Sequence, residues 1–202
     1  MKLLNRSAAR IVRGVLATVV VILAALAPGL ISSGSPLALL RVPLESVLAL
    51  AVLAVLPWSR ARRIGAAVVA LIFVATAASA ALDRGFTTAV GQPFNVATGW
   101  PQLVDGYGVV SDSAGSIAAI VLVVLLILAA AVAALAIAVS FSHLAGVIRR
   151  HARPALVGGS AITAGWVVLA LIGAQIVPGE PVAAADATSA AVAKSGQVAV
   201  AA

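Results

Sequence analysis

The residues of this sequence that could do chemistry are few, and most of them occur in pairs. Arg41 and Glu45 stand four positions apart, a spacing that places both on one face of a helix. Ionisable residues within membrane-spanning segments often mark functional sites. The pair is therefore a candidate polar site at the outer mouth of a helix bundle. In the alternative, structural interpretation, Arg41 extends to the membrane interface and pairs with Glu45.

Two further pairs lie in the middle of the chain. Asp83 and Arg84 follow an apolar run and are interpreted as interfacial anchors or as an ion pair that orients the segment after them. Asp105 and Asp112 are seven positions apart, so a helix would bring them near one face. Two carboxylates could hold a cation, but no third acidic ligand is close in the sequence.

No complete active site can be built from this chain. His143 and His151 flank a basic segment without a carboxylate, whereas a zinc site needs a third protein ligand. The sequence has no cysteine and contains none of the common phosphate-binding, metalloprotease or serine-hydrolase motifs. We therefore expect no cofactor, no metal and no catalysis by this chain alone.

Composition predicts the environment in which these residues lie. Of 202 residues, 63% are hydrophobic and 9% are charged, with a mean hydropathy of +1.18. Soluble domains are about 45–50% apolar and about 25% charged, so lipid is the expected solvent. The chain therefore predicts an all-α polytopic membrane protein: a five-helix transmembrane bundle with one long external loop.

Five apolar stretches are long enough to cross about 30 Å of hydrocarbon. The predicted parts are a basic cytoplasmic tail (1–11), spans at about 12–31, 37–56, 64–82, 117–141 and 155–177, a loop over 83–116 between the third and fourth spans, and a flexible tail (178–202). Basic clusters lie before the first span, between the second and third, and between the fourth and fifth. Because Lys and Arg are retained in the cytoplasm, the N-terminus is predicted to be cytoplasmic and the C-terminus external.

The net charge of +7 would suggest nucleic acid as a partner for a soluble protein. Here the clusters adjoin apolar spans and lack interleaved aromatic residues, so we expect the lipid bilayer and no nucleic acid. The long loop contains apolar and aromatic residues among its Gly, Pro and Asn positions, and short helices are expected around 83–90 and 100–113.

Three short motifs of this loop carry a resemblance to a known family. They are LDRGF at 82–86, QPFN at 92–95, which contains Phe94 and Asn95, and LVDGYGVVSDSAG at 103–115. Together they resemble the long outer loop of bacterial membrane-anchored sulfatase-like proteins, which are similar to the phosphoglycerol transferases of the alkaline phosphatase superfamily. The run RVPLE at 41–45 also resembles the start of that family's second span.

The resemblance implies five spans in a bacterial inner membrane, carrying a large external hydrolase domain. This sequence departs from the family pattern at Gln92, where the family often has Arg, and it ends about 25 residues after the fifth predicted span. None of the family's catalytic residues has a counterpart here. The resemblance therefore implies a membrane-anchor domain, truncated, split or degenerate, whose external domain would be encoded separately.

Two other hypotheses stay open. The chain could be a small accessory subunit that contacts other membrane helices through faces of small residues such as Gly158 and Gly159. A transporter or channel is the third, but it would need polar residues at mid-depth, and few are present.

Overall fold

The computed structural model describes the backbone of residues 2–33, 42–151, 165, 175–177, 180–181 and 183–184, and the side chains of 8–32, 45–151 and 165. This part of the chain holds five helices: α1 (Lys2–Ser33), α2 (Leu44–Val55), α3 (Ser59–Val90), α4 (Trp100–Ala114) and α5 (Ser116–Arg150). Four strands of two or three residues accompany them: β1 (Val42–Pro43), β2 (Gln175–Val177), β3 (Glu180–Pro181) and β4 (Ala183–Ala184). β1 pairs in parallel with β4, and β2 pairs antiparallel with β3.

Three of the helices are long and apolar enough to cross a membrane: α1 over Ala8–Ser32, α3, and α5. They contain the predicted first, third and fourth spans. The predicted second span coincides only in part with α2, whose 12 residues extend for about 18 Å. Residues 37–41 of the predicted second span, and most of the predicted fifth span and tail, lie outside the described residues. The last three residues of that fifth span, including Gln175, form β2 rather than a helix.

The segment predicted as a long loop is mostly helical. α3 continues eight residues past Leu82, through Gly85, and ends only at Gly91, and α4 occupies Trp100–Ala114. Gly91 ends α3 with φ 76°, a left-handed conformation that glycine adopts without steric cost. Gly115, with φ 89°, separates α4 from α5. The connection between α3 and α4 is therefore confined to residues 91–99.

The core lies where the second half of α5 meets α1, α2 and α3. Phe141 is fully buried and stacks on Phe73 of α3, with ring centroids 5.8 Å apart. Around this pair the buried residues are mainly alanines, among them Ala66, Ala70 and Ala145. Small side chains let helices approach closely, the packing expected where lipid removes the hydrophobic drive for association.

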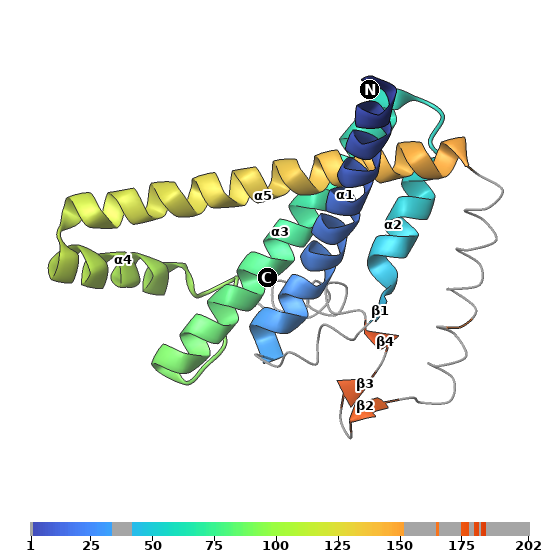
Figure 1. The fold of residues 1–202 in the computed structure, drawn as a ribbon. Helices are drawn as coiled ribbons and strands as arrows, with labels where there is room; N and C mark the ends of the chain where they lie inside the picture. The colour runs from blue at the N-terminus through green and yellow to red at the C-terminus, as the bar shows by residue number, and fades with distance from the viewer. Residues whose placement is uncertain are drawn as a thin grey trace.

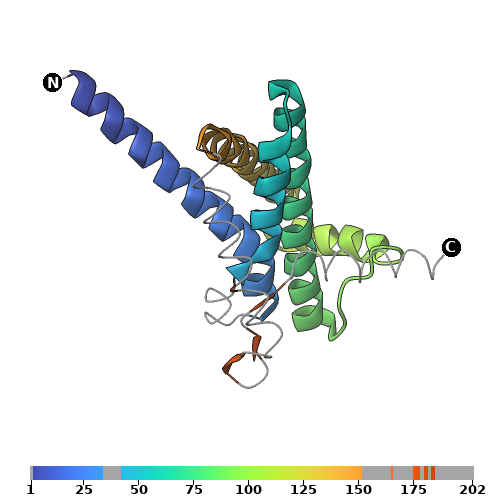
Figure 2. The ribbon, with the colours of Figure 1, turned by 90° about the vertical axis from the view of Figure 1, so that its right-hand side faces the viewer.

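The helices do not form a simple parallel bundle. α5 crosses α1 and α3, and its first half projects away from them (Figure 1), whereas α1 diverges from α2 and α3 toward its N-terminus (Figure 2). α4 lies along this projecting half of α5 (Figure 1). As a result, large apolar side chains of α5 from Ile120 to Leu128 are exposed, and they form a surface suited to lipid contact.

Two arginines tie helix ends together through long-range hydrogen bonds. Arg84 of α3 donates to the carbonyls of Ile31 and Ser32 at 3.3 and 3.1 Å, at the end of α1. Arg149 of α5 donates to the carbonyl of Pro57, just before α3, at 2.8 Å. Helix C-termini carry unsatisfied carbonyls and a partial negative charge, which a guanidinium satisfies. α1 and α3 therefore end near each other, and α5 ends near the beginning of α3.

Candidate ligand-binding site

The candidate site is built on the connection 91–99 between α3 and α4. Phe94 is 2% exposed although it lies in a loop. Its ring packs edge-on against Phe86 of α3 at 5.0 Å and against Trp100 of α4 at 6.0 Å between centroids. Edge-to-face aromatic pairs contribute about 0.5–1.5 kcal/mol each beyond area burial. The aromatic row therefore anchors the loop to both helices.

The loop backbone is held closely around Phe94. The Asn95 side chain accepts a 2.9 Å hydrogen bond from the backbone N–H of Ala97, and the N–H of Gly99 donates to the Asn95 carbonyl at 2.7 Å. A Cβ on Gly99 would lie 2.6 Å from both the Asn95 carbonyl oxygen and a Phe94 ring carbon. Residue 99 must therefore be glycine for the loop to close in this way.

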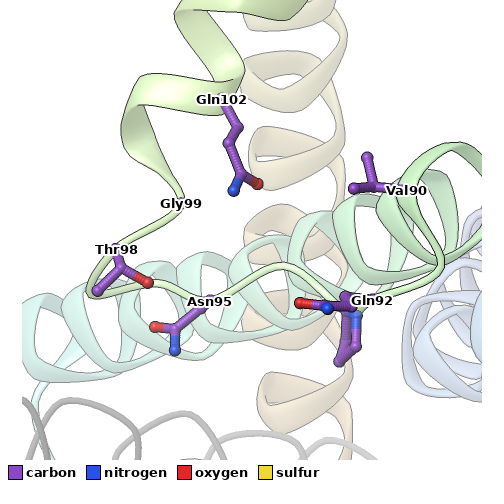
Figure 3. A pocket seen from close by; sticks show the side chains of 7 residues that line it. Val90, Gln92, Asn95, Thr98, Gly99 and Gln102 are labelled. Atoms are coloured by element: carbon purple, nitrogen blue, oxygen red, sulfur yellow. The ribbon is translucent and has the colours of Figure 1, made fainter.

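This loop and the first turn of α4 line a polar pocket of about 400 Å³ that is partly open to the surface, with Gln92, Thr98 and Gln102 exposed. Figure 3 shows the Gln102 side chain of α4 reaching toward the loop, with the Gln92 amide and the Thr98 hydroxyl facing the same space. Within the described part of the chain, none of these three side chains has a hydrogen-bond partner in the protein. None of the described residues that line it is charged. The pocket therefore offers neutral hydrogen-bond donors and acceptors.

An apolar groove of about 870 Å³ adjoins the polar pocket. It runs between the end of α3, one face of α4 and the exposed part of α5, and it shares Val90 and Gln102 with the pocket. Leu122, Val123 and Leu126 of α5 line it. Asp105 and Tyr107 are its titratable lining residues. Both volumes lie in the range typical of small-molecule sites.

The acidic and basic residues predicted as site candidates do not converge on one centre. Arg41 lies outside the described residues, so its pairing with Glu45, which is in the first turn of α2, is not described. Arg84 contacts α1, as described above. Asp105 and Asp112 share α4 at a separation of two helical turns, about 10 Å along its axis. No group of three or more potential metal ligands occurs among the described residues.

Sequence reasoning drew attention to Phe94, Asn95 and Asp105 in this region, and the structure brings them to the loop, the pocket and the groove. Gln102 and Thr98 were not predicted to belong to a site, and Gln92 was considered only as part of the QPFN motif, where it departs from the family pattern. The sequence signal that could have indicated a polar site was the concentration of amide side chains in a segment that contains Gly and Pro. Their convergence depends on the turn of the chain at 91–99.

Comparison of the chain with protein-family models, with curated proteins and with solved structures finds no match. The site must therefore be interpreted from its own geometry. That geometry supports binding through neutral hydrogen bonds beside an apolar surface.

Proposed function

We propose that this chain is a multi-pass membrane protein with a cytoplasmic N-terminus and an external C-terminus, serving as a non-catalytic anchor domain. The observation that carries the proposal is the placement of the basic helix ends. The hydrogen bond from Arg149 to Pro57 joins the basic end of α5 to the basic start of α3. α1 and α3 begin on the same side (Figure 1), and basic residues are retained in the cytoplasm.

Contacts at the opposite ends support the same orientation. Arg84 binds the end of α1, so α1 and α3 have the same direction. The pairing of Val42 with Ala183 lays the tail beside the start of α2, the end of that helix assigned to the external side. α5 runs back, so its end at Arg150 lies on the side assigned to the cytoplasm. The predicted second and fifth spans have no full-length helix among the described residues, because β1 precedes α2 at Val42–Pro43 and β2 occupies Gln175–Val177.

The length of α5 is compatible with this scheme. Its 35 residues extend for about 52 Å, more than the ~30 Å of hydrocarbon. A helix longer than the bilayer can accommodate the excess length by tilting.

The anchor role follows from the loop motifs that resemble sulfatase-like and phosphoglycerol transferase proteins. Phe94 and Asn95, from the QPFN motif, organise the loop at the end of α3. On this proposal the loop faces the external side and would adjoin an external domain. The second candidate, an accessory subunit of a membrane complex, would place another membrane helix instead of lipid against the exposed apolar surface of α5.

Reporter fusions test the topology. Alkaline phosphatase and green fluorescent protein are fused after Pro57, after Gly99, after Arg150 and after Ala202. We expect phosphatase activity after Gly99 and Ala202, and fluorescence after Pro57 and Arg150. The reverse pattern, or phosphatase activity at Arg150, would refute the orientation. Purification from native membranes in mild detergent then separates the roles by the kind of partner retained. An accessory subunit co-purifies with other membrane-spanning chains in fixed stoichiometry, whereas an anchor retains at most a separately encoded external domain.

A further inference from the structure

We propose that the polar pocket at 91–99 and the adjoining apolar groove bind a single membrane lipid with an uncharged, hydroxyl-bearing head group. The head would occupy the pocket lined by Gln92, Thr98 and Gln102, and an acyl chain would occupy the groove between α3, α4 and α5. The proposal requires a membrane location but not the anchor role or the orientation proposed above.

Continuity between the two spaces is the first argument. Val90 and Gln102 line both the pocket and the groove. A single ligand that passes these two residues would therefore be polar at one end and apolar at the other. Lipids have this form, whereas a wholly polar solute would leave the groove empty.

Charge decides the class of head group. Among the described residues, none that lines the pocket is charged, and the groove contributes the carboxylate of Asp105. Arg84, on the same stretch of α3, already donates to two carbonyls of α1. A phosphate head group would thus meet a carboxylate without a dedicated cation. Amides and a hydroxyl, which both donate and accept, match the hydroxyl groups of a sugar or glycerol head.

Access from the bilayer is the third argument. Leu122 and Leu126 line the groove yet are 45% and 62% exposed. The groove is thereby continuous with the apolar surface of α5, which faces lipid in a membrane protein. An acyl chain could enter sideways from the bilayer. Trp100, at the start of α4 and 59% exposed, lies beside the loop and can report occupancy.

The experiment uses the full chain in phosphatidylcholine nanodiscs, with Trp58→Phe and Trp166→Phe leaving Trp100 as the sole tryptophan. Quenching of Trp100 fluorescence is titrated with dibrominated monoglucosyl diacylglycerol and with dibrominated phosphatidylglycerol. We expect saturable quenching by the glucolipid at a mole fraction about tenfold lower than by phosphatidylglycerol, the selectivity of one or two hydrogen bonds. The double substitution Gln92→Leu and Gln102→Leu should abolish this difference.

A matched pair of glycine substitutions tests the groove. Gly106 lines the groove and Gly108 does not, and a Cβ at either position meets no atom within 4 Å. Gly106→Leu should therefore reduce quenching several-fold, whereas Gly108→Leu, the same change on the same helix, should leave it unchanged. Quenching proportional to mole fraction and equal for both lipids would overturn the proposal. So would protection of Trp100 from both lipids accompanied by a dimer in light scattering, because a second copy would then fill the groove.

Discussion

The guanidinium of Arg149 donates a 2.8 Å hydrogen bond to the carbonyl of Pro57, 92 residues earlier in the chain. Pro57 is followed at once by Trp58, the N-cap of α3, which makes no side-chain capping bond. The bond thus attaches the last turn of α5 to the entry of α3. Both of these segments are positively charged. The bond can still form between them because its acceptor is a neutral carbonyl.

Replacing Arg149 tests this attachment. Arg149→Met should lower the free energy of unfolding by about 1 kcal/mol, because a charge-assisted hydrogen bond is lost at an exposed position. Unfolding in mixed detergent and dodecyl sulfate micelles measures the change. Arg150→Met is the control. It removes the same charge, but Arg150 makes no hydrogen bond within the described part of the chain. Equal effects of the two substitutions would contradict a specific role for the bond.

Arg84 offers a second test, at the end of α1. Its guanidinium reaches two successive carbonyls, so Arg84→Leu should destabilise by about 1 kcal/mol by uncapping the helix. Arg84→Lys keeps the charge but has no planar fork, and we expect an intermediate value in the same micellar titration. If the lysine variant is no more stable than the leucine variant, the positive charge at the helix end contributes nothing.

The aromatic pair in the core should matter more. Phe141→Ala should cost about 3 kcal/mol, because a fully buried ring is replaced by a cavity. Val139→Ala, on the same helix at 57% exposure, should cost less than about 0.5 kcal/mol. A double-substitution cycle with Phe73→Ala should give a coupling energy of about 1 kcal/mol for the stacked rings. Additive effects would mean that the two rings stabilise the core independently.

Gly99 is expected to be intolerant of any side chain. Gly99→Ala places a Cβ against the Asn95 carbonyl and the Phe94 ring, so the loop should open and release Phe94, at a cost of about 1–3 kcal/mol. Faster cleavage at 91–99 by a soluble protease and a red shift of Trp100 emission would report the opening. Gly106→Ala, where the Cβ meets open space, serves as the control. An unchanged cleavage rate in Gly99→Ala would show that the loop accommodates the methyl group.

Features that depend on interactions between residues close in the sequence were largely predicted, and features that depend on distant residues were not. The apolar runs around residues 12–31, 64–82 and 117–141 predicted the three long apolar helices, since composition over about 20 residues is a local property. The helical stretches around 83–90 and 100–113 were also expected within the loop. The extent of α3 was missed, because the basic residues at 60–63 and the polar ones after Leu82 end an apolar run without ending a helix.

The sequence by itself determined that the chain is rich in apolar residues, that it forms long apolar helices, and that its positive charge lies next to the apolar runs. The short strand pairs β1–β4 and β2–β3 were not predicted. Only the tertiary structure decided that α5 crosses α1 and α3, that Arg84 and Arg149 bond to the ends of other elements, and that Gln92 and Gln102 face one space. The reason is physical. Helix formation depends on neighbours a few positions away, whereas these relationships depend on close packing among alanines and on single donors that meet carbonyls many residues distant.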